Sequence, residues 1–156
     1  HIQGAHKSSI RMGLVYNDKV VAVLSCIIRE NGDIEITRYV TRIGCVVRGG
    51  FSKLLSHIPV SSENKRIITF SDNMVSDGGL YAANGFTVDR LLPPDYMIVR
   101  NGCERFHKFL YRKERFRTDP ELEYRDGLTE AELDALNGLD RVWDAGKVRW
   151  VRSLCD

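Results

Sequence analysis

The stretch IITFSDNMVSDGGLYAANGF, residues 67–86, decides the fold. It begins with a continuously apolar run, which is typical of a short strand that is buried on both faces. The run leads to Asp72, and residues 77–84 then predict a helix for which Gly85 is the C-cap. A buried strand that passes through a loop into a helix indicates an α/β unit. In such units functional groups gather beyond the carboxyl ends of the strands.

Asp72 and Tyr81 are therefore the first candidate site residues. Asp72 follows the strand, at the place where a catalytic or ligating carboxylate is expected. Tyr81 lies in the first turns of the helix, from which its phenol would point back across the same cleft. A structural role is the alternative for both residues, with Asp72 closing a turn and Tyr81 filling the core.

The rest of the first hundred residues alternates between strand and helix patterns. β-branched residues alternate with polar ones around two turn signals, Asn17-Asp18-Lys19 and Asn31-Gly32, which predicts an antiparallel meander. The apolar spacing becomes helical after Gly49-Gly50, and Pro59 ends that helix. The sequence predicts strands at 12–16, 20–29, 34–40, 66–70, 86–91 and 95–100, and a helix at 51–58. The expected fold class is α+β, with a mixed sheet.

The last third of the chain divides by charge. Residues 101–118 carry +4 and interleave cations with aromatic rings, whereas residues 119–140 carry −7. A basic block with aromatic rings is typical of surfaces that neutralise the phosphates and stack the bases of nucleic acids. A solvated helix with one apolar face gives the same pattern, so both interpretations stay open. The cations predicted to contact nucleic acid are Arg105, Lys108, Arg112, Lys113 and Arg115.

Three elements are predicted in this last part. Residues 105–116 have the composition of a basic helix, a capping box opens an acidic helix at 129–138, and residues 141–151 resemble a small hairpin. We therefore expect a core over residues 1–100. Residues 101–156 form an extension that packs on it.

Two further positions point to an anion. Gly49-Gly50 stands directly before a helix, where main-chain N–H groups and the helix dipole favour a phosphate, although a tight turn for packing explains it as well. Arg38 shares its side-chain parity with Ile36 and Val40, so it lies on an apolar strand face unless a bulge intervenes. An arginine on such a face must find an acidic partner or an anion.

The composition argues against several classes of protein. The net charge is only +2, and the four cysteines form no C-x-x-C pair, which disfavours a zinc ribbon or redox motif and favours reduced thiols. No apolar run approaches the ~20 residues that span a bilayer, so no membrane contact is expected. The four histidines lack the spacing of metal ligands. The chain opens on His1 in sequence that already looks structured, which is typical of a piece of a longer protein.

The order of elements, together with LYAANGF at residues 80–86, resembles the GNAT acyltransferases, whose second motif commonly ends in Leu-Tyr-x-x-x-Gly-Phe. The resemblance implies a GNAT-like fold in which the Gly loop holds the pyrophosphate of an acyl-CoA. It also implies that Tyr81 is the general acid for the departing thiolate. The loop departs from the family pattern at Phe51, whose bulk is expected to crowd a pyrophosphate. The cofactor-binding candidates are Gly49, Gly50 and Ser52.

Most of the chain also resembles the Mom-like branch of that superfamily, phage proteins that hypermodify adenine in DNA. The residues that carry this likeness are His1, Arg38 in EITRYV, Ser52, Asp72 in FSD and Tyr81 in GGLYAANGF. The basic RFHKFLYRK and the later DAGKVRWV follow them in order. The opening HIQG and the segment GGFSKLL are equally similar to the C-terminal regions of phage endonucleases of the homing or very-short-patch-repair type.

The Mom-like resemblance implies a polar cleft built from His1, Arg38, Ser52, Asp72 and Tyr81. It implies transfer of an acyl or carbamoyl-type group to adenine N6 of double-stranded DNA, in the cytoplasm of a phage-infected bacterium. Asp72 would take the proton, Tyr81 would assist the leaving group, and Arg38 and Ser52 would hold the anion of the donor. The resemblance further implies iron, with His1, Asp72 and Tyr81 as ligands.

Two other functions remain open. A catalytically silent relative would serve as the DNA-binding or accessory domain of a mobile-element endonuclease, which the second likeness favours. An ordinary acetyltransferase that acts on a small amine or a protein is the third hypothesis, and the altered Gly loop disfavours it.

Overall fold

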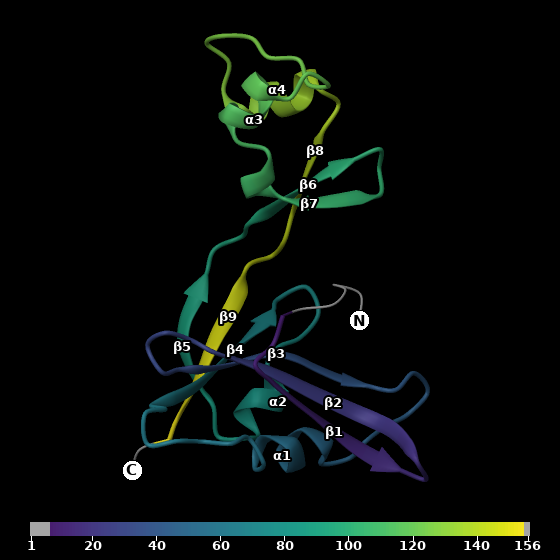
Figure 1. The fold of residues 1–156 in the computed structure, drawn as a ribbon, viewed down its shortest axis with the longest axis vertical. Coiled ribbons are helices and arrows are strands. Elements are labelled where there is room, and N and C mark those ends of the chain that lie inside the picture. Colours follow the sequence, from purple (N-terminus) through teal and green to yellow (C-terminus); the bar gives the residue numbers. More distant parts are fainter. Residues whose placement is uncertain (1–6, 155–156) are drawn as a thin grey trace. The chain divides into compact units, whose positions relative to one another are not determined.

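The computed structural model describes residues 7–154, which form two compact units (Figure 1). The first unit holds the chain up to residue 71, residues 76–91 and the last strand from residue 148 onward. The second unit holds residues 72–75 and 92–147. This division differs from the predicted boundary after residue 100, because the second unit is inserted into the sequence of the first.

The first unit is built on a mixed sheet of six strands in the order β1-β2-β3-β4-β9-β5. β1, β2 and β3 are antiparallel neighbours, and β3 pairs with β4 in parallel. β9 fills the place between β4 and β5, as Figure 1 shows. The elements of this unit are β1 (Ile10–Tyr16), β2 (Lys19–Ile28), β3 (Ile34–Thr41), α1 (Gly50–Leu55), β4 (Arg66–Asp72), α2 (Gly79–Ala82), β5 (Thr87–Leu92) and β9 (Lys147–Ser153).

The meander begins as predicted. Asn17 and Asp18 connect β1 to β2 in a two-residue turn, with φ values of 47° and 57°. Positive φ at both central residues is the requirement of a type I′ hairpin, and Asn and Asp tolerate it best among the residues with a side chain.

A β-bulge in β3 decides the face on which Arg38 lies. Ser25 and Cys26 are adjacent in β2, yet they pair with Arg38 and Ile36, which leaves Thr37 as an extra residue. Side chains before and after an extra residue exchange faces. Arg38 and Ile36 therefore lie on opposite faces, and the shared parity seen in the sequence does not hold.

The core of the first unit lies on one face of the sheet, beneath α1 and α2. Phe51 is 2% exposed, and the rings of Tyr39, Tyr81 and Phe86 surround it at centroid distances of 5.2, 5.8 and 6.5 Å. Because Phe51 of α1 and Tyr81 of α2 meet in one cluster, both helices cover the same face. The buried residues of this core are Ala22, Leu24, Cys26, Ile34, Ile36, Phe51, Leu54, Leu55, Ile58, Ile67, Phe86 and Trp150.

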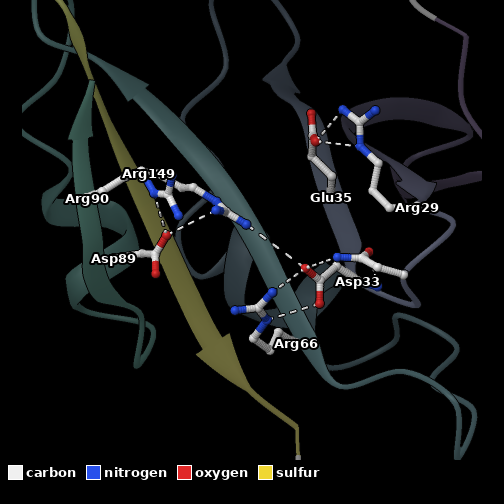
Figure 2. A network of polar contacts seen from close by, with 8 residues as sticks. Arg29, Asp33, Glu35, Arg66, Asp89, Arg90 and Arg149 are labelled. Carbon is white, nitrogen blue, oxygen red and sulfur yellow. Dashed lines mark hydrogen bonds and ion pairs between the residues drawn. The ribbon is translucent and has the colours of Figure 1, made fainter. Parts of the chain in front are cut away.

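The opposite face carries a network of charged side chains (Figure 2). Asp33, which is 2% exposed, accepts hydrogen bonds from Arg66 Nε and Nη2 at 3.0 and 2.7 Å, and from Asn31 Nδ2 at 3.0 Å. Arg149 of β9 lies 4.0 Å from Asp33 and 3.1 Å from Asp89 of β5. The Arg66 guanidinium holds the pKa of the Asp33 carboxyl below its ordinary value. The network thus links the start of β3 to β4, β9 and β5.

The second unit is a three-stranded antiparallel sheet in the order β7-β6-β8, with short helices packed around a core of its own. The capping box of its acidic helix is formed as predicted, since Thr129 N donates to Glu132 Oε2 at 2.7 Å and Glu132 N donates to Thr129 Oγ1 at 3.3 Å. Its buried residues are Ile98, Tyr111, Phe116, Leu133 and Leu139. Its elements are β6 (Tyr96–Arg100), β7 (Glu104–His107), the 3₁₀ helix η1 (Lys108–Leu110), α3 (Lys113–Thr118), α4 (Glu130–Leu136) and β8 (Asp140–Trp143).

Two predicted elements of this region are wrong. Residues 105–116 do not form one helix but pass through β7, η1 and α3, because β7 pairs with β6 and Tyr111 turns into the core between the two short helices. The hairpin at 141–151 is not formed either, because β8 pairs with β6 and β9 belongs to the sheet of the first unit. Trp150 is the physical reason, since its ring is buried in the first core. The alternation of apolar and polar residues predicts a strand, but it does not predict the sheet in which that strand pairs.

In the described part of the chain, no helix is long and apolar enough to cross a membrane. Cys26, Cys45 and Cys103 are free thiols, as expected, and Cys155 lies outside the described residues. Burial raises the pKa of Cys26 to about 12. That cysteine is therefore a structural, unreactive thiol.

Candidate functional site

The candidate site begins at the opening between β3 and β4. The parallel ladder between these strands consists of two pairs, Ile34–Ile67 and Glu35–Ile68. One step later, Thr69 Oγ1 donates to the main-chain oxygen of Ile36 at 3.3 Å, so a side chain takes the next acceptor. Beyond this point the structure of residues 7–154 shows no pairing between the two strands. The edge of β3 from Thr37 onward is therefore open on that side.

The loop that follows β3 enters α1 through a tight turn. Val47 O accepts a hydrogen bond from Gly50 N at 3.1 Å, and Gly49 has the positive φ, 66°, that such a turn requires at its third residue. The main-chain N–H groups of residues 46–49 have no hydrogen-bond partner within the described chain. Successive free N–H groups bind an anion when the backbone turns them toward one point.

Phe51 does not crowd this loop, contrary to the prediction. Its ring turns into the core and meets Tyr39 edge-on. Gly50 stands beside the loop instead, where an added Cβ would lie 2.7 Å from Val47 Cγ1 and 2.8 Å from the Tyr39 hydroxyl oxygen. Glycine is needed at this position because Tyr39 and Val47 approach the backbone too closely for a side chain.

Tyr39 is a residue that sequence reasoning missed. Burial raises the pKa of its phenol, and a hydrogen bond with the backbone of Phe51 opposes that rise. The phenol therefore lies at the first turn of α1, where main-chain N–H groups lack helical partners. The bulge that places Tyr39 on the core side of β3 leaves no mark in the sequence.

Tyr81 packs in the core and keeps its hydroxyl at the edge of β4. Its ring lies 5.8 Å from that of Phe51, 5.9 Å from that of Phe86 and 6.0 Å from that of Trp150. Its hydroxyl donates to the main-chain oxygen of Phe70 at 3.5 Å, beyond the last pair of the parallel ladder. The phenol is thus placed at the open part of β4, and its catalytic role stays a prediction.

Ser52 and Arg38 have contacts of their own. Ser52 Oγ donates to Asn84 Oδ1 at 2.5 Å, and Asn84 Nδ2 donates to Leu80 O at 2.8 Å, which links α1 to α2. A hydroxyl has one hydrogen, so Ser52 is not free to donate to a phosphate in this arrangement. Arg38 Nη1 donates to Thr37 O at 2.6 Å, while its buried Nε has no partner in the described chain. That Nε is thus an unsatisfied donor that the surrounding residues shield from solvent.

Asp72 is the last residue of β4 and belongs to the second unit. Its carboxylate accepts a hydrogen bond from Met74 N at 2.9 Å, which closes a local turn. His1 lies outside the described residues. Among Arg38, Ser52, Asp72 and Tyr81 the structure records no direct contact, so the shared polar cleft stays a prediction.

The described residues do not fit an iron site. They contain no group of three or more His, Cys, Asp or Glu side chains that could hold a metal ion. Tyr81 donates its hydroxyl hydrogen to a carbonyl, and Asp72 closes a turn.

Three of the five cations predicted to contact nucleic acid are paired within the second unit. Lys108, Arg112 and Arg115 form ion pairs with Asp95, Glu130 and Asp119, at 2.5, 2.9 and 3.3 Å. The structure shows no ion pair or hydrogen bond for the side chain of Arg105 within the described chain. Acidic residues that lie between four and eighteen positions away in the sequence thus neutralise these three cations of the basic block.

Two exposed rings accompany these cations. Phe109 has the Arg112 guanidinium carbon 4.8 Å from its ring centroid. Trp143 is 55% exposed and lies 4.9 Å from the ring of Tyr96, which in turn has the Arg141 guanidinium carbon at 4.5 Å. Rings flanked by cations retain free area on which a nucleic-acid base can stack.

Comparison with known proteins identifies the fold. No protein-family model and no curated protein matches the chain. Among solved structures, an IAA acetyltransferase from Bacillus cereus ATCC 14579 superposes with a TM-score of 0.51 at 15% identity, over 92% of this chain and 77% of that one. A GNAT family acetyltransferase from Elizabethkingia anophelis with acetyl-CoA bound gives 0.50 at 13% identity, over 90% and 72%.

An aminoglycoside 6'-acetyltransferase type Ii also gives a TM-score of 0.50 at 13% identity, over 94% of this chain and 69% of that one. At sequence identities of 13–15%, this structural similarity shows the fold alone. The chain has the α+β mixed-sheet fold of the GNAT acetyltransferases, as predicted.

Proposed function

We propose that this chain is an acyltransferase domain, which takes an acyl group from a coenzyme A thioester and passes it to an amine of double-stranded DNA such as adenine N6. The observation that carries the proposal is the opening between β3 and β4, where the parallel ladder stops after two pairs. The fold supports it, since one structure with this fold is described with acetyl-CoA bound.

The residues at the opening fit a coenzyme A donor. The unpaired edge of β3 offers main-chain donors and acceptors to an extended chain that carries amide groups. The free N–H groups of residues 46–49 suit the phosphates, and the ring of Phe51 is turned away from them into the core. A bound donor supplies the acyl carbon as an activated thioester.

Tyr81 and Asp72 carry the proton transfers in this proposal. The hydroxyl of Tyr81, which the main-chain oxygen of Phe70 orients along β4, gives its proton to the departing sulfur. Asp72 accepts the proton that the attacking amine loses. Arg38, whose buried Nε has no partner in the described chain, holds an anionic group of the bound substrates through its guanidinium.

DNA is proposed as the acceptor because of the surfaces of both units. The sequence of the first unit contains thirteen Lys or Arg and eight Asp or Glu residues, a net charge of +5. The second unit exposes Phe109 and Trp143 beside cations. The resemblance of the sequence to the Mom-like branch points to the same acceptor.

The test is a transfer assay with acetyl-CoA and an adenine-containing duplex, in which mass spectrometry of the nucleosides detects the adduct. Tyr81→Phe keeps the ring packing and removes the proton, so we expect turnover to fall about 100-fold or more. Asp72→Asn should also lower turnover, because the amide cannot accept the proton that the attacking amine loses. Tyr16→Phe alters an exposed tyrosine of β1 and is the matched control, which should keep the activity of the wild type.

The outcomes separate the parts of the proposal. Acyl transfer to small amines but not to DNA would support the proposed acyltransferase activity and contradict DNA as its acceptor. A Tyr81→Phe variant with full turnover would remove Tyr81 from the mechanism.

A non-catalytic DNA-binding or accessory domain of an endonuclease is the second candidate. Two contacts favour this non-catalytic role. The hydroxyl of Tyr81 and the carboxylate of Asp72 are each already hydrogen-bonded to the main chain. In that case the protein binds duplex DNA in a salt-sensitive manner and leaves it unmodified. Acetyl-CoA would then not raise the melting temperature, since no ligand stabilises the folded state.

A further inference from the structure

The turn that follows β3 carries an aliphatic side chain at its tip. Cys45 N donates to Arg42 O at 2.9 Å, and Gly44 has a φ of 77°, which is the arrangement of a type II turn. Ile43 occupies the second position of this turn and is 99% exposed. Arg42 N donates to Val21 O at 2.9 Å, so the base of the turn is anchored to β2.

The fold provides no reason for an isoleucine at this position. The second residue of such a turn favours proline or a polar residue, and Ile43 takes no part in the core of the first unit. Val46, three residues further on, is 89% exposed. Single exposed apolar residues are common, so the two residues of this loop gain significance only from what lies beside them.

The same loop carries two free cations. The side chains of Arg42 and Arg48 form no hydrogen bond or ion pair within the described chain, unlike Lys108, Arg112 and Arg115 of the second unit. A loop that carries an aliphatic tip and two free guanidinium groups complements duplex DNA, which has phosphates outside and stacked apolar rings inside. An anionic lipid surface offers the same charge, but two aliphatic side chains bury little area in a bilayer.

We propose that the turn Arg42–Cys45 is a wedge that enters the DNA duplex, where Ile43 fills the space of a base that has left the stack. The inference rests on the proposed DNA acceptor and supplies a step that its chemistry needs, because adenine N6 is out of reach inside a duplex. β3 connects the proposed acyl-transfer site to the wedge, because the strand with the open edge leads directly into the turn Arg42–Cys45. The arginines hold the flanking phosphates while Ile43 occupies the gap.

The experiment uses mixed-sequence duplexes in which 2-aminopurine replaces one adenine in every nearest-neighbour context. The fluorescence of this base rises when it leaves the stack, and it reports extrusion without any acyl transfer. The wild-type protein should raise the signal in at least one context. Ile43→Asn suits the turn but removes the apolar tip, so we expect the signal to fall about tenfold, while binding to the single strand changes less than about twofold.

Two matched variants make the result specific. Ile43→Leu should restore most of the signal, because the wedge needs an aliphatic side chain of this size. Leu91→Asn removes an exposed apolar residue of β5 and should leave the signal unchanged.

Each outcome decides the inference. Equal signals from Ile43→Asn and the wild type, or equal losses on duplex and single strand, would overturn the wedge and leave the DNA acceptor intact. No binding of the wild type to any duplex would overturn both, and binding to anionic phospholipid vesicles instead would make the loop a membrane contact. An Ile43-dependent signal without acyl transfer would support the wedge and contradict the proposed chemistry.

Discussion

The two units of this chain differ in the balance of their charged side chains. In the second unit, Arg112 and Arg115 of the basic block pair with acidic residues, and the sequence of that unit contains ten Lys or Arg and thirteen Asp or Glu residues, a net charge of −3. In the first unit, the acids Asp33, Glu35 and Asp89 pair with four arginines, whereas Arg42 and Arg48 stay unpaired in the described chain. The cations of a charged run can therefore form ion pairs within the folded unit. Two separated arginines, in contrast, remain free to bind a partner.

The largest expected contrast between the units concerns their tryptophans. Trp150 is 7% exposed, and its indole Nε1 donates to Ser71 Oγ at 2.9 Å, so Trp150→Ala should lower the free energy of unfolding by about 3–5 kcal/mol. Trp143 is half exposed, and Trp143→Ala should cost about 1 kcal/mol or less. Urea unfolding followed by far-ultraviolet circular dichroism measures both values. Equal losses would show that the second unit depends on Trp143 as the first does on Trp150.

The buried carboxylates provide a second contrast, with opposite responses to pH. Asp33 has a lowered pKa because of Arg66, so its stabilisation is present above the ordinary value of 3.8 and is lost as the pH falls through its folded pKa. Burial raises the pKa of Asp134 more than Arg141 lowers it, so folding there becomes more favourable as the pH falls through its folded pKa. At neutral pH, Asp33→Asn should cost about 2 kcal/mol, because Arg66 loses a charged partner.

Acid titration of the melting temperature tests these signs. Asp33→Asn should make the loss of stability in acid shallower than in the wild type, and Asp134→Asn should make it steeper. If both variants changed the slope of melting temperature against pH in the same direction, the opposite pKa shifts of the two carboxylates would be contradicted.

The smallest expected effect concerns the salt dependence of duplex binding. Replacing Arg42 and Arg48 by Gln should reduce the slope of log affinity against log salt by about 2, since each free cation that contacts a phosphate releases one counterion. Replacing Arg112 and Arg115 by Gln should change it by less than about 1, because both already pair with acids. Titrations at several salt concentrations measure the slopes. The reverse order would assign the DNA contact to the second unit.

Local patterns predicted much of the fold. The turn at Asn17-Asp18, the strand predicted at 66–70 and the capping box at Thr129 depend on neighbours within a few residues, and the structure contains all three, the strand continuing to Asp72. The fold class follows from the order of these elements. Such features are decided by backbone preferences that the sequence displays directly.

The remaining features depend on contacts between distant residues. The bulge at Thr37 sets the faces of Arg38 and Tyr39, yet a single extra residue has no sequence signal. Glu130 neutralises Arg112 from eighteen residues away, and the helical phase of α1 turns Phe51 away from the Gly loop. For these reasons the sequence placed candidate residues at the strand ends but did not predict the contacts that their side chains make.

The position of β9 has a consequence for synthesis of the protein on the ribosome. β9 completes the sheet between β4 and β5, but residues 92–147 are translated between β5 and β9. At about 5–20 residues per second, the nascent chain waits roughly 3–11 seconds with the edges of β4 and β5 unpaired. The inserted unit, whose sheet and helices come from this continuous segment, is complete before its host. Slower elongation through this segment would lengthen the exposure of those edges and favour aggregation of the nascent chain.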